Sequence, residues 1–281
     1  MRVFGRFPFV LAGLLLLGGV GLVAPAAAQL THVPSVRSDN MPSRRADEDS
    51  TRASVPPPSA PGATLSHVVG DEATLHNRPS ASTPVARLPV RTPLRRLDCA
   101  DDWCRVRTEE GRTGFVPAED VSSVWLRVSK SDRLLYLYRG PRLVETFKID
   151  VGYNTFADKQ RRGSRTKRDH WRTPEGTFYV IKKNPRSRFY KALVLNYPTV
   201  ADARRGRRQD LISQAQYEAI VEAQEDFRMP PMNTKLGGWI EIHGEGTGDS
   251  TNWTQGCVAV QNRVMNELWT QVPVGTPVLI E

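Results

Sequence analysis

The residues of this sequence that could carry out chemistry are one histidine, His243, and one cysteine, Cys257, fourteen positions later. His243 ends an alternating, strand-like run and precedes Gly244, while Cys257 follows Gly256 and begins a second apolar run. A cysteine attacks as its thiolate, and a neighbouring imidazole is the usual base that forms it. We therefore predict Cys257 as a nucleophile and His243 as its acid and base. Backbone N–H groups at Gly256 and Cys257 are expected to stabilise the oxyanion of a tetrahedral intermediate.

Simpler interpretations of these residue types remain open. A lone cysteine is often a small buried hydrophobe, and a lone histidine is often structural or solvated. His170 lies in a charged loop and not at a strand end, so we assign it no catalytic role. Three cysteines without a second nearby histidine do not predict a zinc site, and no phosphate-binding loop or nucleotide fingerprint is present. The sequence therefore predicts no metal and no cofactor.

The elements that must position this pair are mostly strands, because short alternating runs separated by turn residues fill the sequence from residue 63 onward. The predicted fold class is mainly β. Residues 63–122 suit a small barrel, and residues 124–281 form a second β-rich domain with one or two helices. Two histidines of the first part, His67 and His76, have no visible partner and are interpreted as surface or turn residues.

The pattern of the sequence predicts one helix over residues 210–228. Ser213 and Gln216 resemble a capping box, and two prolines after residue 229 end the helix. The apolar face is expected to contain Ile212, Ala215, Ala219, Ala223 and Phe227. A shorter helix is predicted over residues 262–270.

The first 62 residues carry no folded domain in this prediction. Residues 1–28 have the charged start, apolar run and small-residue cleavage site of a secretory signal peptide. The apolar run of 9–23 is shorter than the roughly twenty residues of a membrane-spanning helix, so cleavage is favoured over an anchor. Residues 29–62 are rich in Pro, Ser, Arg and Asp and are expected to be a disordered linker. The mature protein is therefore predicted to be exported to the periplasm or cell envelope, with no stable membrane span.

Export determines how the cysteines and the charge are interpreted. In an oxidising compartment Cys99 and Cys104 are predicted to form a disulfide, with two unpaired thiols as the alternative, and Cys257 stays free. The formal charge of +9 becomes +7 without the two arginines of the signal peptide. Such a charge suits an anionic cell envelope, and an exported protein meets little nucleic acid.

The second domain resembles the L,D-transpeptidase catalytic domain of the YkuD type, and the stretch around Cys257 is most similar to the YafK-like subgroup. The residues that carry the resemblance are Lys130–Tyr138, Asp158–Gln160, Arg172–Phe178, His243–Gly244, Asn252–Val260 and Gly275–Val278. The first domain is similar to bacterial SH3-like domains, which commonly accompany wall-modifying enzymes. That second resemblance rests on Ala73–Ser80, Asp102–Arg107 and Gly111–Val116.

The resemblance implies a cysteine acyltransferase that forms a thioester at the third residue of a peptidoglycan stem peptide. It also implies substrate contacts from Gly244, Trp253, Thr254, Gln255 and Arg172. Two departures stand out, because the family usually has histidine where this chain has Gln255 and arginine where it has Ala259. The YafK-like subgroup shares both. The alternatives are therefore a hydrolase of the same fold, including one that releases a wall-linked lipoprotein, and a non-catalytic peptidoglycan-binding protein.

Residues 158–172 contain seven Lys and Arg against two Asp. A solvated loop is the common explanation of such a run. In the resembling family the loop precedes a turn near the substrate groove, which gives the hypothesis that Arg161, Arg162 and Arg165 contact carboxylates of the wall peptide. A papain-like peptidase is disfavoured, since there the cysteine precedes the histidine.

Overall fold

A computed structural model describes residues 63–281 of the chain. The predicted signal peptide, 1–28, and linker, 29–62, lie outside the described residues. Among the residues described, none of the helices has the length and apolar character that crossing a membrane requires. The described part is mainly β, as predicted, and its strands belong to three sheets.

The first seven strands form one antiparallel sheet in the order β3-β2-β6-β5-β4-β1-β7. They are β1 (Thr64–Val68), β2 (Glu72–His76), β3 (Pro84–Pro89), β4 (Pro93–Ala100), β5 (Trp103–Thr108), β6 (Thr113–Pro117) and β7 (Val121–Ser122), with a 3₁₀ turn η1 (Ala118–Asp120) before the last. Cys99 and Cys104 face each other across the β4–β5 pair and are joined by a disulfide. Small apolar side chains such as Val68, Leu75 and Val106 fill the core.

His67 and His76 are both buried, so their interpretation as surface or turn residues is wrong. Their neighbours Val68 and Leu75 point into the core, so the period-2 alternation places each imidazole on the opposite face of its strand, where other parts of the chain bury it. The ring of His76, for example, meets Trp103 edge-on at 5.1 Å between centroids. The Nε2 atom of His67 and the Nδ1 atom of His76 are buried without a hydrogen-bond partner in the described structure. Burial lowers the pKa of His67 from 6.5 to about 4.

The second domain is built on an eight-stranded mixed sheet in the order β10-β9-β8-β17-β12-β13-β14-β16. Its strands are β8 (Val124–Ser129), β9 (Leu134–Arg139), β10 (Arg142–Lys148), β12 (Gly176–Ser187), β13 (Tyr190–Leu195), β14 (Glu241–His243), β16 (Val258–Ala259) and β17 (Pro277–Ile280). A two-stranded sheet pairs β11 (Val151–Gly152) with β15 (Asn252–Thr254), and η2 (Arg168–His170) is a 3₁₀ turn. The strands alternate between buried and exposed positions, which agrees with the period-2 pattern of the sequence.

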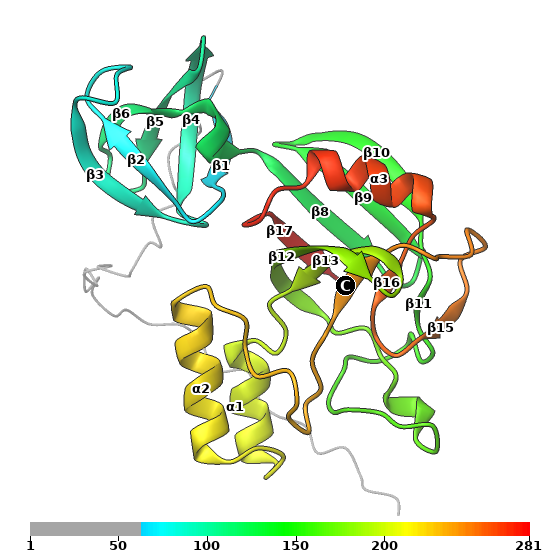
Figure 1. Cartoon of the computed structure of the whole chain (residues 1–281). Coiled ribbons are helices and arrows are strands. Elements are labelled where there is room, and N and C mark those ends of the chain that lie inside the picture. Colours follow the sequence, from blue (N-terminus) through cyan, green and yellow to red (C-terminus); the bar gives the residue numbers. More distant parts are fainter. Residues whose placement is uncertain (1–62) are drawn as a thin grey trace, which may run out of the picture. The chain divides into compact units, whose positions relative to one another are not determined.

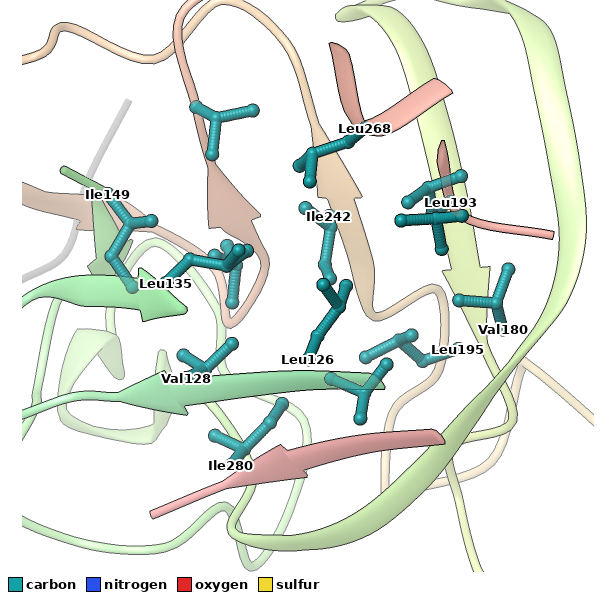
Figure 2. Close-up of a cluster of buried hydrophobic side chains, with 14 of the residues drawn as sticks. Leu126, Val128, Leu135, Ile149, Val180, Leu193, Leu195, Ile242, Leu268 and Ile280 are labelled. Carbon is teal, nitrogen blue, oxygen red and sulfur yellow. The ribbon is translucent and has the colours of Figure 1, made fainter. Parts of the chain in front are cut away.

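One apolar core holds the second domain together. Figure 2 shows Leu126, Leu195 and Ile242, which come from three different strands, gathered in this interior together with Leu268. Leu268 belongs to α3 (Asn262–Gln271), whose buried side chains join the same cluster. The helix therefore shares its core with β13, β14 and β16. The predicted base, His243, is the last residue of β14, and the predicted nucleophile, Cys257, comes directly before β16.

Three α-helices are present in the described residues, one more than the sequence predicted. In Figure 1 α1 (Val200–Arg208) and α2 (Gln214–Glu225) lie side by side. The Ser213–Gln216 capping box starts α2, as predicted. The predicted apolar face is partly wrong, because the alanines at 215 and 219 are exposed while Ile220 and Gln224 are buried. Alanine favours a helix without needing burial, so the larger side chains decide which face packs.

Candidate active site

The sheet brings His243 and Cys257 to one side of the fold. Strand β14 pairs in parallel with β16, with Ile242 opposite Val258 and His243 opposite Ala259. Residues two apart in a strand project from the same face. Cys257, two positions before Ala259, therefore projects from the face that carries His243. Both residues line a single cavity of about 800 Å³.

Cys257 is the free cysteine of the described chain, and its sulfur is partly open to this cavity. The thiol donates a hydrogen bond to the carbonyl oxygen of Trp239 at 3.3 Å. Burial among crowded protein atoms, followed by the Glu241 carboxylate, raises the pKa of Cys257 to about 12. The backbone N–H of Glu241 and the ammonium of Lys159 lower it without reversing that effect. The Cys257 side chain is therefore a neutral thiol at pH 7.

His243 is buried and held in one orientation. Its Nδ1 atom lies 2.6 Å from the carbonyl oxygen of Gly244. A carbonyl oxygen can only accept, so Nδ1 carries the proton and Nε2 keeps a free lone pair. The ring stacks on Phe189 at 4.4 Å between centroids, and Trp253 meets it edge-on at 6.1 Å. Burial lowers the pKa of His243, so the imidazole is a neutral base.

The loop between β14 and β15 is fixed by Asp150, which is fully buried. Its carboxylate accepts hydrogen bonds from the Thr247 N–H and hydroxyl, from the Thr251 N–H and from Nε1 of Trp253, at 2.7 to 2.9 Å. Burial alone would raise the pKa of Asp150, but these hydrogen bonds lower it below the ordinary value. Asp150 thereby positions Trp253 beside His243, although Asp150 and Trp253 are 103 positions apart in the sequence.

The turn before Cys257 gives Gly256 a different role from the predicted one. The Gly256 N–H donates to the Thr254 hydroxyl oxygen at 3.2 Å, and that hydroxyl donates to the Cys257 carbonyl at 2.7 Å. The Gly256 N–H is therefore occupied and is not a free oxyanion donor. The N–H of Cys257 itself makes no hydrogen bond to any residue of 63–281, so it remains as the donor of this turn.

Gly256 is required by its conformation and by its surroundings. Its φ of +131° is a conformation that L side chains rarely adopt. A Cβ atom at this position would lie 2.5 Å from the carbonyl oxygen of Arg172 and 3.2 Å from Nζ of Lys159. The turn thus places the backbone of Arg172 and the ammonium of Lys159 directly against the residue that precedes the nucleophile.

The predicted substrate contacts divide into two groups. Trp253, Thr254 and Gln255 line the cavity. Gly244 and Arg172 do not line it, which corrects their assignment as substrate contacts. Gly244 orients His243 through its carbonyl oxygen, and Arg172 donates to the carbonyl oxygens of residues 158 and 169. Both residues therefore support the site by holding the neighbouring side chain and backbone in place.

Lys159 is a residue of the site that sequence reasoning did not assign. Its side chain is only 3% exposed and its Nζ donates to the Gln255 carbonyl at 3.2 Å. Burial lowers its pKa from 10.5 to about 8, and the negative charge of a Cys257 thiolate acts in the opposite direction. An ammonium buried on the wall of the cavity can therefore offset negative charge that forms at Cys257.

The basic loop contributes one residue to the cavity wall. Arg162 lines the cavity and donates from Nη2 to the Met232 carbonyl at 2.8 Å, while Arg161 and Arg165 are exposed. His170 is half-buried and does not line the cavity. Over the described range, no group of three or more His, Cys, Asp or Glu side chains is arranged to hold a metal ion.

The comparison with protein-family models shows to which family this chain belongs. The model of the L,D-transpeptidase catalytic domain, YkuD, matches residues 123–280, which is more than half of the 281 residues. This chain belongs to the L,D-transpeptidase family. The bacterial SH3 domain model matches residues 71–122, directly before it.

Solved structures to which this chain is similar include an L,D-transpeptidase from Xylanimonas cellulosilytica, with 18% identity over 57% of this chain and 61% of that one, at a TM-score of 0.35. Bd1075 from Bdellovibrio bacteriovorus has 20% identity over 57% and 47%, at 0.36. An L,D-transpeptidase from Mycobacterium smegmatis has 14% identity over 78% and 82%, at 0.33. The match spans less than two thirds of the first two chains. Among curated proteins, none matches this sequence.

Proposed function

We propose that this L,D-transpeptidase-family protein is an exported cysteine acyltransferase that modifies peptidoglycan. It forms a thioester with the third residue of a stem peptide. The observation that carries this proposal is the pairing of a neutral thiol, Cys257, with a base on the same cavity, His243, whose Nδ1 proton is committed to the Gly244 carbonyl. The family supplies the substrate class. The apolar run behind Arg2 and Arg6 supports export.

Acylation begins from two neutral groups. Nε2 of His243 takes the proton from the Cys257 sulfur as the sulfur attacks the carbonyl carbon of the third residue. The carbonyl electrons move onto its oxygen, and the oxyanion accepts a hydrogen bond from the Cys257 N–H. Lys159 offsets the negative charge that develops first on sulfur and then on oxygen. This cation is needed here because burial makes an isolated thiolate unfavourable.

Collapse of the intermediate breaks the bond to the leaving amine. That amine takes the proton from Nε2 of His243 and departs, which leaves the acyl group on sulfur and a neutral imidazole. A second nucleophile then attacks the thioester carbonyl while Nε2 of His243 accepts its proton. The intermediate collapses, the bond between carbon and the Cys257 sulfur breaks, and the sulfur takes the proton back from His243, which restores the neutral thiol and imidazole. An amine as the second nucleophile gives transpeptidation, and water gives hydrolysis.

Hydrolysis is the second candidate, and the position of Ala259 favours it. Ala259 is fully buried in β16 and exchanges two backbone hydrogen bonds with Asp150, at 2.8 and 2.9 Å. No cation therefore projects from this position to hold a terminal substrate carboxylate, and Gln255 adds none. A protein of this kind, similar to the YafK-like subgroup, would release tripeptides or a wall-linked lipoprotein. The third candidate is a peptidoglycan-binding protein without activity.

The three candidates give different products from purified sacculi. We propose to incubate the mature protein, and its Cys257→Ala variant as the inactive control, with sacculi and to identify the muropeptides by mass. New cross-links between two third residues indicate a transferase, and freed tripeptides or lipoprotein indicate a hydrolase. Unchanged muropeptides together with sacculus binding would overturn the enzymatic proposal and leave the binding protein.

A further inference from the structure

Glu241 is a buried carboxylate on the wall of the active-site cavity. It lies on β14 two positions before His243, so its side chain projects from the same face as the base. The residue is 8% exposed and lines the cavity together with Cys257. Its backbone N–H supports the sulfur, but its carboxylate raises the pKa of Cys257.

The Glu241 carboxylate has no hydrogen-bond or ion-pair partner in residues 63–281. Two other acidic residues in this range are buried, and both are fully engaged. Asp150 accepts four hydrogen bonds in its loop, and Asp202 accepts from Thr199 and Arg205. Glu241 accepts none and forms no ion pair. Its oxygens are also not among the buried atoms closed off from solvent without a partner, so they are open to the cavity.

An unpaired buried carboxylate is unfavourable for the fold and for the nucleophile. Burial raises the pKa of Glu241, which reflects the cost of removing the charge from water. Its negative charge also disfavours the thiolate that the reaction needs. Glu241 thus lowers the stability of the fold and disfavours the Cys257 thiolate. A bound ligand with a positive charge would remove both effects, which gives a functional reason for a carboxylate at this position.

Arg188 keeps the carboxylate available for such a ligand. Arg188 lines the same cavity, and its positive charge opposes part of the rise in the pKa of Glu241 that burial causes. Within residues 63–281 no ion pair joins Arg188 to Glu241, and the guanidinium of Arg188 lies over the Phe189 ring at 4.6 Å. The carboxylate therefore lies open to the cavity without a hydrogen-bond or ion-pair partner in residues 63–281.

We propose that Glu241 binds an ammonium group on the residue that carries the scissile carbonyl, so that the site selects a diamino acid with a free amine. This inference rests on the proposed function and identifies the residue that reads the substrate. Docking of the ammonium also cancels the negative charge beside Cys257. The thiol then becomes easier to deprotonate only when the correct substrate is bound.

The test is a binding measurement in the Cys257→Ala background, where no turnover occurs. The probes are two synthetic stem tetrapeptides, one with diaminopimelate at the third position and one with 2-aminopimelate, which lacks the second amine. We expect the amine to strengthen binding by about tenfold or more, as for a hydrogen bond between charged groups. Calorimetry gives the two dissociation constants.

The variants separate recognition from other roles. Glu241→Gln has the same shape and is expected to bind both peptides equally, while Asp249→Asn removes an exposed acid outside the cavity lining and should keep the preference. In the active protein, Glu241→Gln should also speed alkylation of free Cys257, because it removes the opposing charge. Equal binding of both peptides by the parent, or a preference that survives Glu241→Gln, would overturn the inference. Failure to alter sacculi would instead overturn the proposed function alone, whichever peptide binds.

Discussion

The pKa of Cys257 leads to a prediction about the free protein that separates two forms of the mechanism. A preformed thiolate–imidazolium pair would react with an alkylating agent at neutral pH. A neutral thiol beside a neutral imidazole would react only slowly there. We expect the second behaviour, so alkylation of Cys257 by iodoacetamide should be slow at pH 7 and should accelerate steadily as pH rises.

The size of the effect follows from the raised pKa. A change from 9.0 to about 12 lowers the thiolate fraction at pH 7 about a thousandfold. A more basic thiolate is intrinsically more nucleophilic, which recovers about thirtyfold. Cys257 should therefore react about thirtyfold more slowly than an ordinary cysteine at pH 7.

The assay follows iodoacetamide labelling by intact-protein mass spectrometry from pH 6 to 10. A free peptide with the sequence of residues 252–260 serves as the reference thiol, and the Cys257→Ala variant verifies the labelled position. The logarithm of the rate should rise by about one per pH unit across the whole range. A plateau that begins near neutral pH, or a rate above that of the peptide at pH 7, would refute the neutral-pair mechanism.

The remaining predictions concern three residues, Lys159, Gly256 and His67. The folded pKa of Lys159 is about 8, so at pH 7 the buried side chain is charged and destabilises the fold by its full desolvation cost. Lys159→Met removes this charge, and the free energy of unfolding in urea should therefore rise by up to about 3 kcal/mol. Turnover of sacculi by the same variant should fall about tenfold or more, and unchanged turnover would contradict the role of the cation. Gly256→Ala places a Cβ against the Arg172 carbonyl and should reduce turnover on the order of a hundredfold with an unchanged circular dichroism spectrum. His67 has a lowered folded pKa, so its contribution to stability is complete above pH 6.5 and should decrease by about 3 kcal/mol as pH falls to 4. His67→Gln should remove that pH dependence. If the variant loses as much stability between pH 6.5 and pH 4 as the parent protein, His67 is not the group responsible.

The sequence was sufficient to predict the parts of the molecule that repeat a local pattern. Strands with period-2 alternation, such as β8 and β9, lie where the pattern predicts them. The capping box of α2 is a signal of four residues and was equally readable. Helix α1 was missed because four arginines and a glycine leave no apolar period over Val200–Arg208. Its capping box, Thr199 with Asp202, was the available signal.

The parts of the site that the sequence could not provide depend on contacts between distant segments. The chemistry of His243 and Cys257 is a property of residue types and spacing. Lys159 becomes relevant only because the chain folds back to within hydrogen-bond distance of Gln255. Likewise, the occupied N–H of Gly256 depends on a turn geometry that the letters Thr-Gln-Gly do not specify.

The hydrogen bonds around Asp150 have a consequence for how the candidate site forms during folding. The loop of residues 244–251 has no apolar core of its own, and its amides at Thr247 and Thr251 are held by a carboxylate about a hundred positions earlier in the chain. This loop beside the candidate site is therefore ordered only once the segment containing Asp150 has docked against β16. Amide hydrogens in an exposed loop should exchange as slowly as those of the surrounding strands, and a partly folded chain should have no competent site.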